Sequence, residues 1–538
     1  MKRIELTIRM MVVLVLLTIT SCTKKLDLVP TNDLTAEDVY SSPGGYKQSL
    51  AKVYAAFALT GNGTNGNGTG SQDIPAQIIR DEGNSDFLRL YWNLQELTTD
   101  EAAWTWQNDG GIRGLHELNW SSINPIISGL YYRSFFQISL ANEFIRQSTD
   151  DILSSRSISG ASADSIRKYR AEVRFLRAYQ YWILMDLYAN PPFVTEVDAV
   201  GTALPKQIQR KDLFAYIEKE LKEIEVEMVP ARANEYGRAD QGAVWALLAR
   251  MYLNAETYIE APRYTDAITY CKKIIAAGYS LHPKYRELML ADNHLNANEF
   301  LFVITYDAQY TRNYGGTTYL THGPAAVPGS ISGTSGNWGG LRVTQNFVNL
   351  FPDPSGNTDK RPQFYTTGQN REMTDLYTGT DGYSITKYRN KTRTGGPAPH
   401  ADTQGEWVDI DFPIFRLAEI YLIYAESVLR GGTGGDAATA LGYINLVRAR
   451  AFENTSGNIN ASQLTLDFIL DERGRELYFE AHRRTDLIRH KKFTTSNYLW
   501  AWKGGVAGGR AVENKYNIFP LPTTDLTSNP NLVQNPGY

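Results

Sequence analysis

Apolar residues recur at three- and four-residue spacings in several stretches of the chain, which is the pattern of helices that bury one face. The clearest stretch covers residues 167–188, where further apolar positions widen the stripe. Asn190-Pro191-Pro192 follows and ends it, because the residue before a proline disfavours helical geometry. The chain is therefore predicted to be mainly α-helical, with further helices over residues 35–57 (at least from Gly45), 211–229, 241–256, 264–277, 414–430, 437–451 and 466–492.

A short motif recurs within these predicted helices. One copy matches the W-x2-L-G-x2-Y spacing of a tetratricopeptide first helix, with alanine for glycine, and consists of Trp245, Leu248, Ala249 and Tyr252. Ala267 lies where the second helix of such a repeat needs a small residue. The frame recurs with substitutions at Arg174, Arg177, Ala178 and Tyr181, and at Tyr421, Tyr424, Ala425 and Val428. Since a single helix pair cannot bury its apolar faces, we expect a tetratricopeptide-like helical stack; the alternative is a chance match of amphipathic helices that contain alanine.

The pattern changes between residues 281 and 411. Residues 299–306 predict a strand, and residues 312–340 contain eight glycines interspersed with aromatic side chains. A loop of that length is usually functional or disordered, and the aromatic residues favour order. We expect three parts, namely an N-terminal helical part with a ligand loop (35–300), a loop-rich insertion with short strands (301–411) and a C-terminal part that completes the helical scaffold (412–538).

The N-terminus has the pattern of a lipoprotein signal. Lys2, Arg3 and Arg9 precede a short apolar run over residues 10–20, which is shorter than the ~20 residues of a spanning helix. Ile19-Thr20-Ser21-Cys22 resembles the bacterial lipobox, in which the cysteine is lipidated. This predicts a signal peptide over residues 1–21 and a lipid anchor at Cys22 with a tether to residue 34; an ordinary signal with a chance cysteine is the alternative.

Composition and charge narrow the function classes. The 538 residues exceed one ordinary single-core domain, so two lobes or one large repetitive unit are expected. Hydrophobic residues at 42% and charged residues at 21% exclude wholesale disorder. The net charge is −4, and removal of residues 1–21 takes away three basic residues and one acidic residue. Without a long run of Lys or Arg, nucleic acid is not an expected partner.

No catalytic motif is found in the sequence. It lacks H-E-x-x-H, G-x-S-x-G and a phosphate-binding P-loop. Residues 353–359 alternate like a calcium loop, with Asp353, Ser355, Asn357 and Asp359, yet Phe364 holds the position of the bidentate ligand, so a solvated turn is predicted. We therefore expect no catalytic residue, no metal site and no cofactor. The only other cysteine, Cys271, lies in a predicted helix, so no disulfide framework is expected.

The densest cluster of charged residues covers residues 470–487. Asp471 with Arg475, and Glu480 with Arg484, are oppositely charged pairs four residues apart. Such pairs are weak when exposed. The density of charge beside Leu477, Phe479 and Leu487 predicts partly buried, structural pairs that hold the helix to its neighbours.

Residues 470–492 closely resemble the C-terminal signature of the SusD/RagB family, the surface glycan- and nutrient-binding lipoproteins of Bacteroidetes. The resemblance spans the mature chain, since further segments agree: Pro30, residues 33–40, Leu97-Thr98-Thr99-Asp100-Glu101, Arg174-Phe175-Leu176-Arg177-Ala178, residues 412–419, Ile518-Phe519-Pro520-Leu521-Pro522 and Asn535-Pro536-Gly537-Tyr538. Thr23-Lys24-Lys25 departs from the acidic run that often follows the cysteine of exported lipoproteins, so exposure at the cell surface rests on the family likeness.

The resemblance implies four tetratricopeptide-like helix pairs with a loop-rich part that holds the ligand. It also implies a place at the outer membrane, facing the cell exterior, and a partner, a SusC-like TonB-dependent transporter over which the protein forms a lid. It implies no enzymatic activity.

An oligosaccharide site needs flat aromatic platforms and polar side chains that bind hydroxyl groups. Residues 71–111 and 306–340 supply this mixture, although no fixed family motif marks the site. We expect Trp104, Trp106 and Trp338 to form one ligand arc, because they lie in polar, glycine-flanked loops; packing onto the scaffold is the alternative for each ring. The full candidate set is Asp73, Arg80, Asp81, Trp104, Trp106, Tyr306, Tyr310, Tyr314, Tyr319 and Trp338.

Three other functions fit the sequence less directly. A capture lid for peptides would share the architecture. A helical-repeat glycoside hydrolase would need two carboxylates about 5 to 9 Å apart in one cleft. A tetratricopeptide scaffold for other proteins would bind no small ligand. The sequence does not name the glycan, because linkage specificity lies in the shape of the loops.

Overall fold

The computed structural model describes residues 35–61, 73–199, 201 and 204–538. The predicted signal peptide, Cys22 and the tether lie outside the described residues. None of the helices described is both long enough and apolar enough to span a membrane.

The described chain is mainly helical, as predicted. The long helices of the scaffold are α3 (Pro43–Ala55), α6 (Pro125–Gln147), α8 (Gly160–Tyr188), α9 (Arg210–Ile224), α10 (Gln241–Leu253), α12 (Tyr264–Ala276), α16 (Leu417–Leu429), α17 (Ala437–Phe452) and α18 (Leu466–Leu477). The shorter helices are α2 (Ala36–Val39), α4 (Phe87–Glu96), α5 (Ile112–His116), α7 (Asp150–Ser155), α11 (Ala255–Ile259), α13 (Gly316–His322), α14 (Gly329–Ser332), α15 (Gln345–Val348), α19 (Arg483–Arg489) and α20 (Thr523–Ser528).

The strands are short and pair two by two within the described residues. Every pair is antiparallel: β1 (Ala103–Trp104) with β5 (Leu341–Arg342), β2 (Pro192–Phe193) with β3 (Lys206–Gln207), β4 (Phe300–Ile304) with β8 (Phe412–Arg416), and β6 (Phe364–Tyr365) with β7 (Ser384–Ile385). The predicted strand over residues 299–306 is confirmed as β4.

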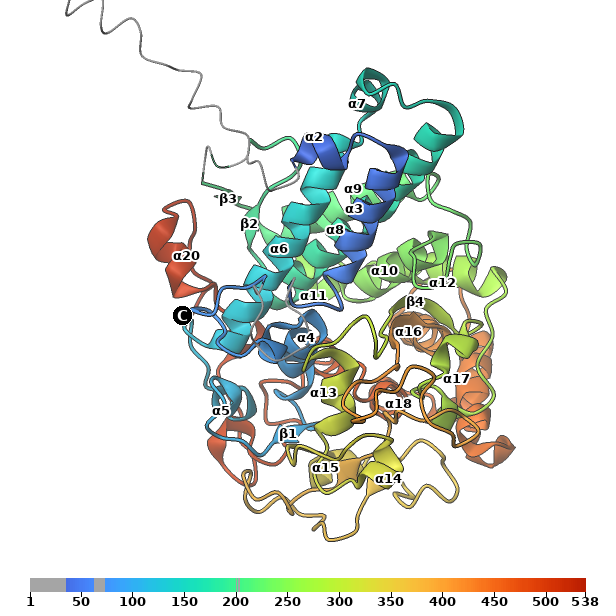
Figure 1. The fold of residues 1–538 in the computed structure, drawn as a ribbon. Helices are drawn as coiled ribbons and strands as arrows, with labels where there is room; N and C mark the ends of the chain where they lie inside the picture. Colours follow the sequence, from blue (N-terminus) through green and yellow to red (C-terminus); the bar gives the residue numbers. More distant parts are fainter. Residues whose placement is uncertain (1–34, 62–72, 200, 202–203) are drawn as a thin grey trace, which may run out of the picture.

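Neighbouring helices pack in sequence order into the predicted stack (Figure 1). α6 packs on α8 and α8 on α9, α10 packs on α12, and α12 leads to α16 and α17. Ala249 and Ala267 are fully buried between α10 and α12, which lets the two helices approach closely. Rings fill the remaining space, since Tyr252 lies 5.8 Å from Tyr270 and Tyr421 stacks 4.5 Å from Tyr443.

The polar substitutions in the α8 copy of the motif have a structural reason. Arg174 and Arg177 both bind the carboxylate of Glu220 on α9, at 2.8 and 2.9 Å. Ion pairs therefore join α8 to α9 at these two positions.

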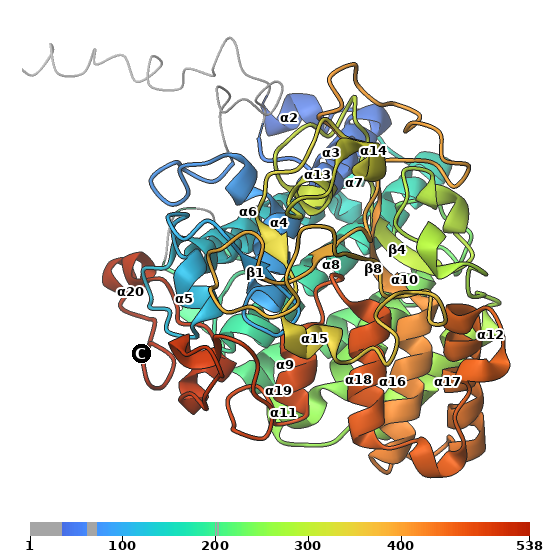
Figure 2. The same ribbon diagram turned by 90° about the horizontal axis from the view of Figure 1, so that it is seen from below.

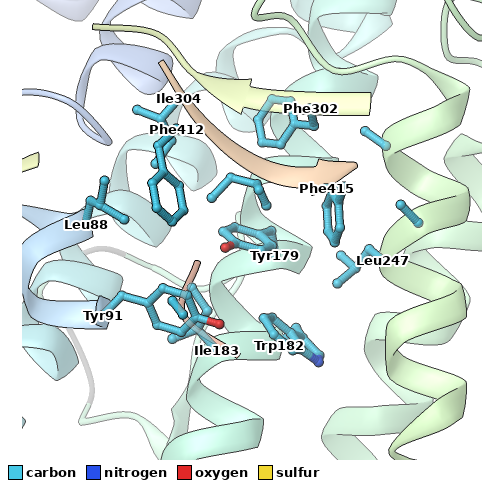
Figure 3. Packing of buried hydrophobic residues seen from close by; sticks show 14 of the residues in the cluster. Leu88, Tyr91, Tyr179, Trp182, Ile183, Leu247, Phe302, Ile304, Phe412 and Phe415 are labelled. Atoms are coloured by element: carbon cyan, nitrogen blue, oxygen red, sulfur yellow. The ribbon is translucent and has the colours of Figure 1, made fainter. Parts of the chain in front are cut away.

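The core lies where the β4–β8 ribbon crosses the helices (Figure 3). Phe302 on β4 packs edge-on against Phe175 at 5.4 Å, and Phe415 on β8 packs against Tyr179 at 6.1 Å. Both partners lie on α8, so the ribbon joins the start and the end of the insertion to the central helix.

Several predicted helices end earlier or contain breaks. Residues 35–57 break at Ser41–Ser42 into α2 and α3, and residues 241–256 break at Asn254. The prediction of helix for residues 414–416 was wrong, because these residues pair with β4. Within the first segment predicted to supply ligand residues, residues 87–96 form α4, whose first turn is capped by Asp86.

The predicted helix over residues 466–492 is broken at Tyr478–His482, where Phe479 and Ala481 adopt positive φ. Side chains from distant parts of the chain form hydrogen bonds with the backbone groups of this break. The carbonyl of Phe479 accepts from Trp92 and from Tyr388, and its N–H donates to Glu101 at 2.9 Å. The break is stabilised because these buried groups all find partners.

The charge cluster is structural, as predicted, but its pairing differs. Arg475 pairs with Glu472, and Glu480 pairs with Arg416 and Lys387, so the predicted pairs four residues apart were wrong. Helix α18 ends at Leu477, which places Glu480 and Arg484 off a common helix face. Arg484 instead lies over the ring of Phe519 at 4.3 Å.

Arg416 is the centre of a buried ion-pair network. Its guanidinium lies 3.0 Å from Glu299, 2.6 Å from Glu476 and 2.6 Å from Glu480. Arg450 on α17 also binds Glu299 and Glu476. We call these five residues the Arg416 network; all are buried, and they join β8, α17 and the α18–α19 segment.

The insertion is attached to this network through its own basic residues. Lys387 binds Glu480 at 2.6 Å, and Arg361 binds Glu472 at 2.8 Å. These contacts hold the loop-rich part to α18 and to the break that follows it. The loop-rich part lies at the lower end of the molecule in Figure 1, which Figure 2 shows from below, and α2 lies at the opposite end.

We expect Arg416→Met to lower the free energy of unfolding by about 3–5 kcal/mol, because it leaves buried carboxylates without their cation. Chemical denaturation checks this. Arg113→Met is the matched control, since Arg113 pairs with Glu117 from a side chain that is 64% exposed, and its effect should be much smaller. Equal effects of the two substitutions would contradict the role of the network.

Glu96 and Glu101 form a buried carboxyl pair beside the α18–α19 break. Burial raises the pKa of Glu101 to about 7 and raises the pKa of Glu96 well above its usual range. The folded chain therefore binds more protons than the unfolded chain between pH 4.5 and 7, so this pair makes stability fall as pH rises through that window.

We expect Glu101→Gln to gain stability relative to the natural chain at pH 8 but not at pH 5, because the amide needs no proton. Thermal melts across this pH range measure the difference. Glu37→Gln, an exposed residue of α2, should leave the profile unchanged. A constant offset between Glu101→Gln and the natural chain at all pH values would contradict the assignment.

Candidate functional site

The two sequence segments predicted to hold the ligand meet in the structure. Strand β1 pairs with β5, and the hydroxyl of Thr105 donates to the carbonyls of Gly339 and Gly340 at 2.8 and 2.9 Å. Gly340 lies against the Trp104 ring so closely that a Cβ atom there would be 2.2 Å from it. Glycine is therefore needed for the two segments to touch.

A second junction lies a short distance along the same segments. The carboxylate of Asp86 accepts from the N–H of Gly316 at 2.8 Å, and Arg89 donates to the carbonyl of Tyr314 at 2.9 Å. Gly83 lies against Tyr314, where a Cβ atom would be 2.6 Å from the Cβ of that tyrosine. The loop before α4 is thus fixed beside Tyr314.

Three predicted ligand rings are buried, which revises the predicted arc. Trp104 is 1% exposed, Tyr319 is 1% exposed and Tyr306 is 6% exposed. Trp104 packs on Tyr319 at 5.5 Å and donates from its indole to Asp109 at 3.0 Å, while Tyr319 donates to Asn93. These rings support the surface from beneath and offer no free face to a ligand.

The rings that reach the surface are Trp106, Tyr310, Tyr314 and Trp338. Trp106 is 42% exposed and packs edge-on against Trp104 at 4.9 Å. Tyr314 and Trp338 are half-buried and lie 6.1 Å apart at 63°. Tyr310 is 77% exposed and makes no ring contact among the described residues.

Tyr314 is oriented through its hydroxyl group, which donates to the carboxylate of Glu406. Burial, together with this hydrogen bond, raises the pKa of Tyr314 to about 12, so the phenol stays a donor at neutral pH. Its ring also packs on Trp407 at 5.0 Å.

A cavity of about 380 Å³ opens at the loop that follows Trp106. Its wall mixes apolar side chains with charged and amide groups, and for these groups we call it the polar cavity. Asp109 lines it and caps the turn that begins at Trp106, through its N–H to the carbonyl of Trp106 at 3.1 Å. The other polar residues of the wall include the predicted Arg80 and Asp81 and the unpredicted Asn84 and Asn108. The backbone N–H of Asn84 donates to Asp81 at 3.1 Å, which shapes this edge of the cavity.

Asp73 has a structural partner. It pairs with the buried Arg133 at 2.9 Å, and Arg133 in turn donates to the carbonyl of Ser85. The carboxylate thus holds the loop before α4 to α6 rather than facing the cavity wall.

A second cavity, of about 320 Å³ and mainly apolar, lies between α3, β4 and the loop around Tyr236. None of the predicted ligand residues lines it. It is therefore separate from the polar cavity.

At two places outside these cavities, acidic side chains form hydrogen bonds or ion pairs with residues near them. Asp353 accepts from Ser355 and Thr358, as expected of the solvated turn predicted there. Asp307, His400 and Asp409 lie within 4.8 Å of one another; His400 contacts Asp307 at 2.7 Å, and Asp409 accepts from backbone N–H groups.

Sequence reasoning missed the residues that position the rings. His322, Glu406 and Trp407 lie far in sequence from the rings they contact, so no local pattern marks them. Asn108 and Asp109 carried a signal, because Asn-Asp-Gly after an aromatic pair is typical of a turn that presents polar side chains.

The chain is similar to known proteins over nearly its whole length. The SusD family model matches residues 375–538. The starch-binding protein SusD of Bacteroides thetaiotaomicron is 35% identical, over 97% of this chain and 96% of that protein. The SusD-like protein P25 of Formosa agariphila is 25% identical over 59% of this chain and 63% of that protein.

Solved structures show the same fold. Surface glycan-binding protein A from Bacteroides fluxus matches with a TM-score of 0.70 at 20% identity, over 92% of this chain and all of that one. The protein of the same name from Bacteroides thetaiotaomicron, in complex with laminarihexaose, matches with a TM-score of 0.66 at 19% identity, over 91% of this chain and 99% of that one. With a relative this similar over nearly its whole length, the chain belongs to the SusD family.

Proposed function

We propose that this protein is a non-catalytic, lipid-anchored carbohydrate-binding subunit that captures oligosaccharides and delivers them to a SusC-like TonB-dependent transporter in the outer membrane. The anchor is Cys22, and the ligand surface faces the cell exterior. The observation that carries the proposal is the exposed ring of Trp106, held by a buried tryptophan beside a polar cavity.

The chemistry of this surface fits a sugar chain. Trp106, Tyr314 and Trp338 supply ring faces for the apolar C–H face of pyranose rings, each adding about 0.5–1.5 kcal/mol beyond area burial. Arg80, Asp81 and the neighbouring asparagines offer donors and acceptors for hydroxyl groups. We call these three rings and the polar cavity the ligand surface; exposed Tyr310 stays a candidate at its margin.

The first ligand to test is a starch fragment. The relative that is 35% identical over nearly the whole chain is named as starch-binding, which favours an α-glucan over other polymers. The structural neighbour with bound laminarihexaose supports oligosaccharide binding on this fold, although at 19% identity it does not support a particular linkage.

The position of the chain's first described helix supports the proposed orientation. Helix α2 lies at the end of the molecule opposite α13, α14 and β1 in Figure 1. A tether that leads from Cys22 to α2 would leave the ligand surface pointing away from the membrane.

We expect Trp106→Ala and Trp338→Ala each to weaken binding of maltoheptaose by about 5- to 20-fold, because each removes one ring platform. Isothermal titration calorimetry of the soluble chain that starts after Cys22 measures this. Tyr236→Ala is a matched control, since Tyr236 is 41% exposed and lines the apolar cavity instead. Unchanged affinity in folded Trp106→Ala and Trp338→Ala variants would reject the ligand surface.

We expect no sustained release of reducing ends when the purified chain is incubated with starch. Asp109 is occupied by the Trp104 indole and Glu406 by the Tyr314 hydroxyl, so neither carboxylate is placed for acid–base chemistry. A reducing-sugar assay checks this against buffer alone. Steady release that Asp109→Asn abolishes would favour a hydrolase instead.

A further inference from the structure

His322 ends helix α13 directly beside a ring of the ligand surface. The residue is 1% exposed, and its imidazole lies nearly parallel to the indole of Trp338, with ring centroids 5.0 Å apart and planes at 15°. The backbone adds a second link, because the N–H of Trp338 donates to the carbonyl of His322 at 2.7 Å. His322 therefore supports one face of the indole.

Both nitrogens of the imidazole contact backbone carbonyl oxygens. Nδ1 lies 2.8 Å from the carbonyl of Gly336, and Nε2 lies 3.0 Å from the carbonyl of Glu406. Gly336 is two residues before Trp338, whereas the side chain of Glu406 accepts the hydroxyl hydrogen of Tyr314. One imidazole thus connects the segment that carries Trp338 with the loop that holds Tyr314.

The protonation state of the imidazole decides how many of these two carbonyls receive a hydrogen bond from it. A neutral imidazole has one N–H and donates to one carbonyl, whereas the imidazolium donates to both. Burial lowers the pKa of His322, while the carboxylates of Glu406 and Asp402 oppose that shift. At neutral pH the ring therefore donates to one carbonyl and packs on the indole as an uncharged plate.

We propose that His322 is a positioning residue of the ligand surface, which fixes Trp338 and Tyr314 in one arrangement without contacting the sugar. This role rests on the proposed function. Because the imidazole is buried beneath the indole, it acts through Trp338 and the Glu406 loop.

The position of the ring donors allows matched substitutions. The amide nitrogen of asparagine falls near the position of Nδ1, so His322→Asn keeps a donor for the carbonyl of Gly336. The longer glutamine places its amide near Nε2, so His322→Gln keeps a donor for the carbonyl of Glu406. His322→Ala removes the plate and both donors.

A double-substitution cycle with Trp338→Ala tests the proposal through maltoheptaose affinity measured by calorimetry. We expect His322→Ala to weaken binding by about 3- to 10-fold in the natural chain and by a clearly smaller factor in the Trp338→Ala background, because only the link through Glu406 to Tyr314 then remains. His322→Asn should recover most of the affinity. His490→Ala, a buried histidine of the scaffold that contacts Glu426, should leave binding unchanged in both backgrounds.

Three results would overturn the proposal. Equal losses with His322→Ala in the two backgrounds would mean a general effect on folding, and no loss in the natural chain would mean that the ring needs no support. If Trp338→Ala itself leaves binding unchanged, the ligand surface is wrong and this role falls with it. Circular dichroism reports folding; should His322→Ala not fold, His322→Gln, which loses the flat ring and the donor for the carbonyl of Gly336, completes the same cycle.

Discussion

The structure depends on a cluster of charges that are buried far from water. Arg416 and Arg450 hold Glu299, Glu476 and Glu480 at positions where isolated carboxylates would be strongly unfavourable, so loss of either arginine would leave buried carboxylates short of a cation. Their attachment to β8, α17 and the α18–α19 break determines where the insertion lies, because Lys387 binds Glu480 in that break and Arg361 binds Glu472 on α18. A solenoid of helices alone would not specify that placement.

The ligand surface is built in two layers. Trp104 and Tyr319 are buried and fill the space under the surface, and Gly340 lets its loop approach Trp104 without steric clash. Trp106, Tyr314 and Trp338 form the outer layer; Trp106 is held by Trp104, Tyr314 by Glu406 and Trp338 by His322. Each ring contributes only a small free energy to sugar binding. A surface that is ordered before the sugar arrives therefore binds more tightly, because no free energy is spent on ordering its loops.

The helical stack could be predicted from sequence because apolar periodicity and the tetratricopeptide spacing are local signals. The predicted helix boundaries were wrong where contacts with distant residues determine the backbone conformation. Residues 414–416 form a strand because β4 lies beside them. The helix breaks after residue 477 because Glu101, Trp92 and Tyr388 bind its backbone. The site was predicted as two segments, but composition does not separate an exposed ring from a supporting one. Trp104 and Trp106 are only two residues apart, yet Trp104 is 1% exposed and Trp106 is 42% exposed. The difference arises because Tyr319 and Gly340 pack against Trp104.

The most direct test of the central claim is a crystal structure of the chain that starts after Cys22, soaked with maltoheptaose. The account predicts a glucan whose sugar rings lie on Trp106, Tyr314 and Trp338, with hydroxyl groups that reach the polar cavity at Arg80 and Asp81. A glucan bound instead in the apolar cavity between α3 and β4, or cleaved at the ligand surface, would contradict it.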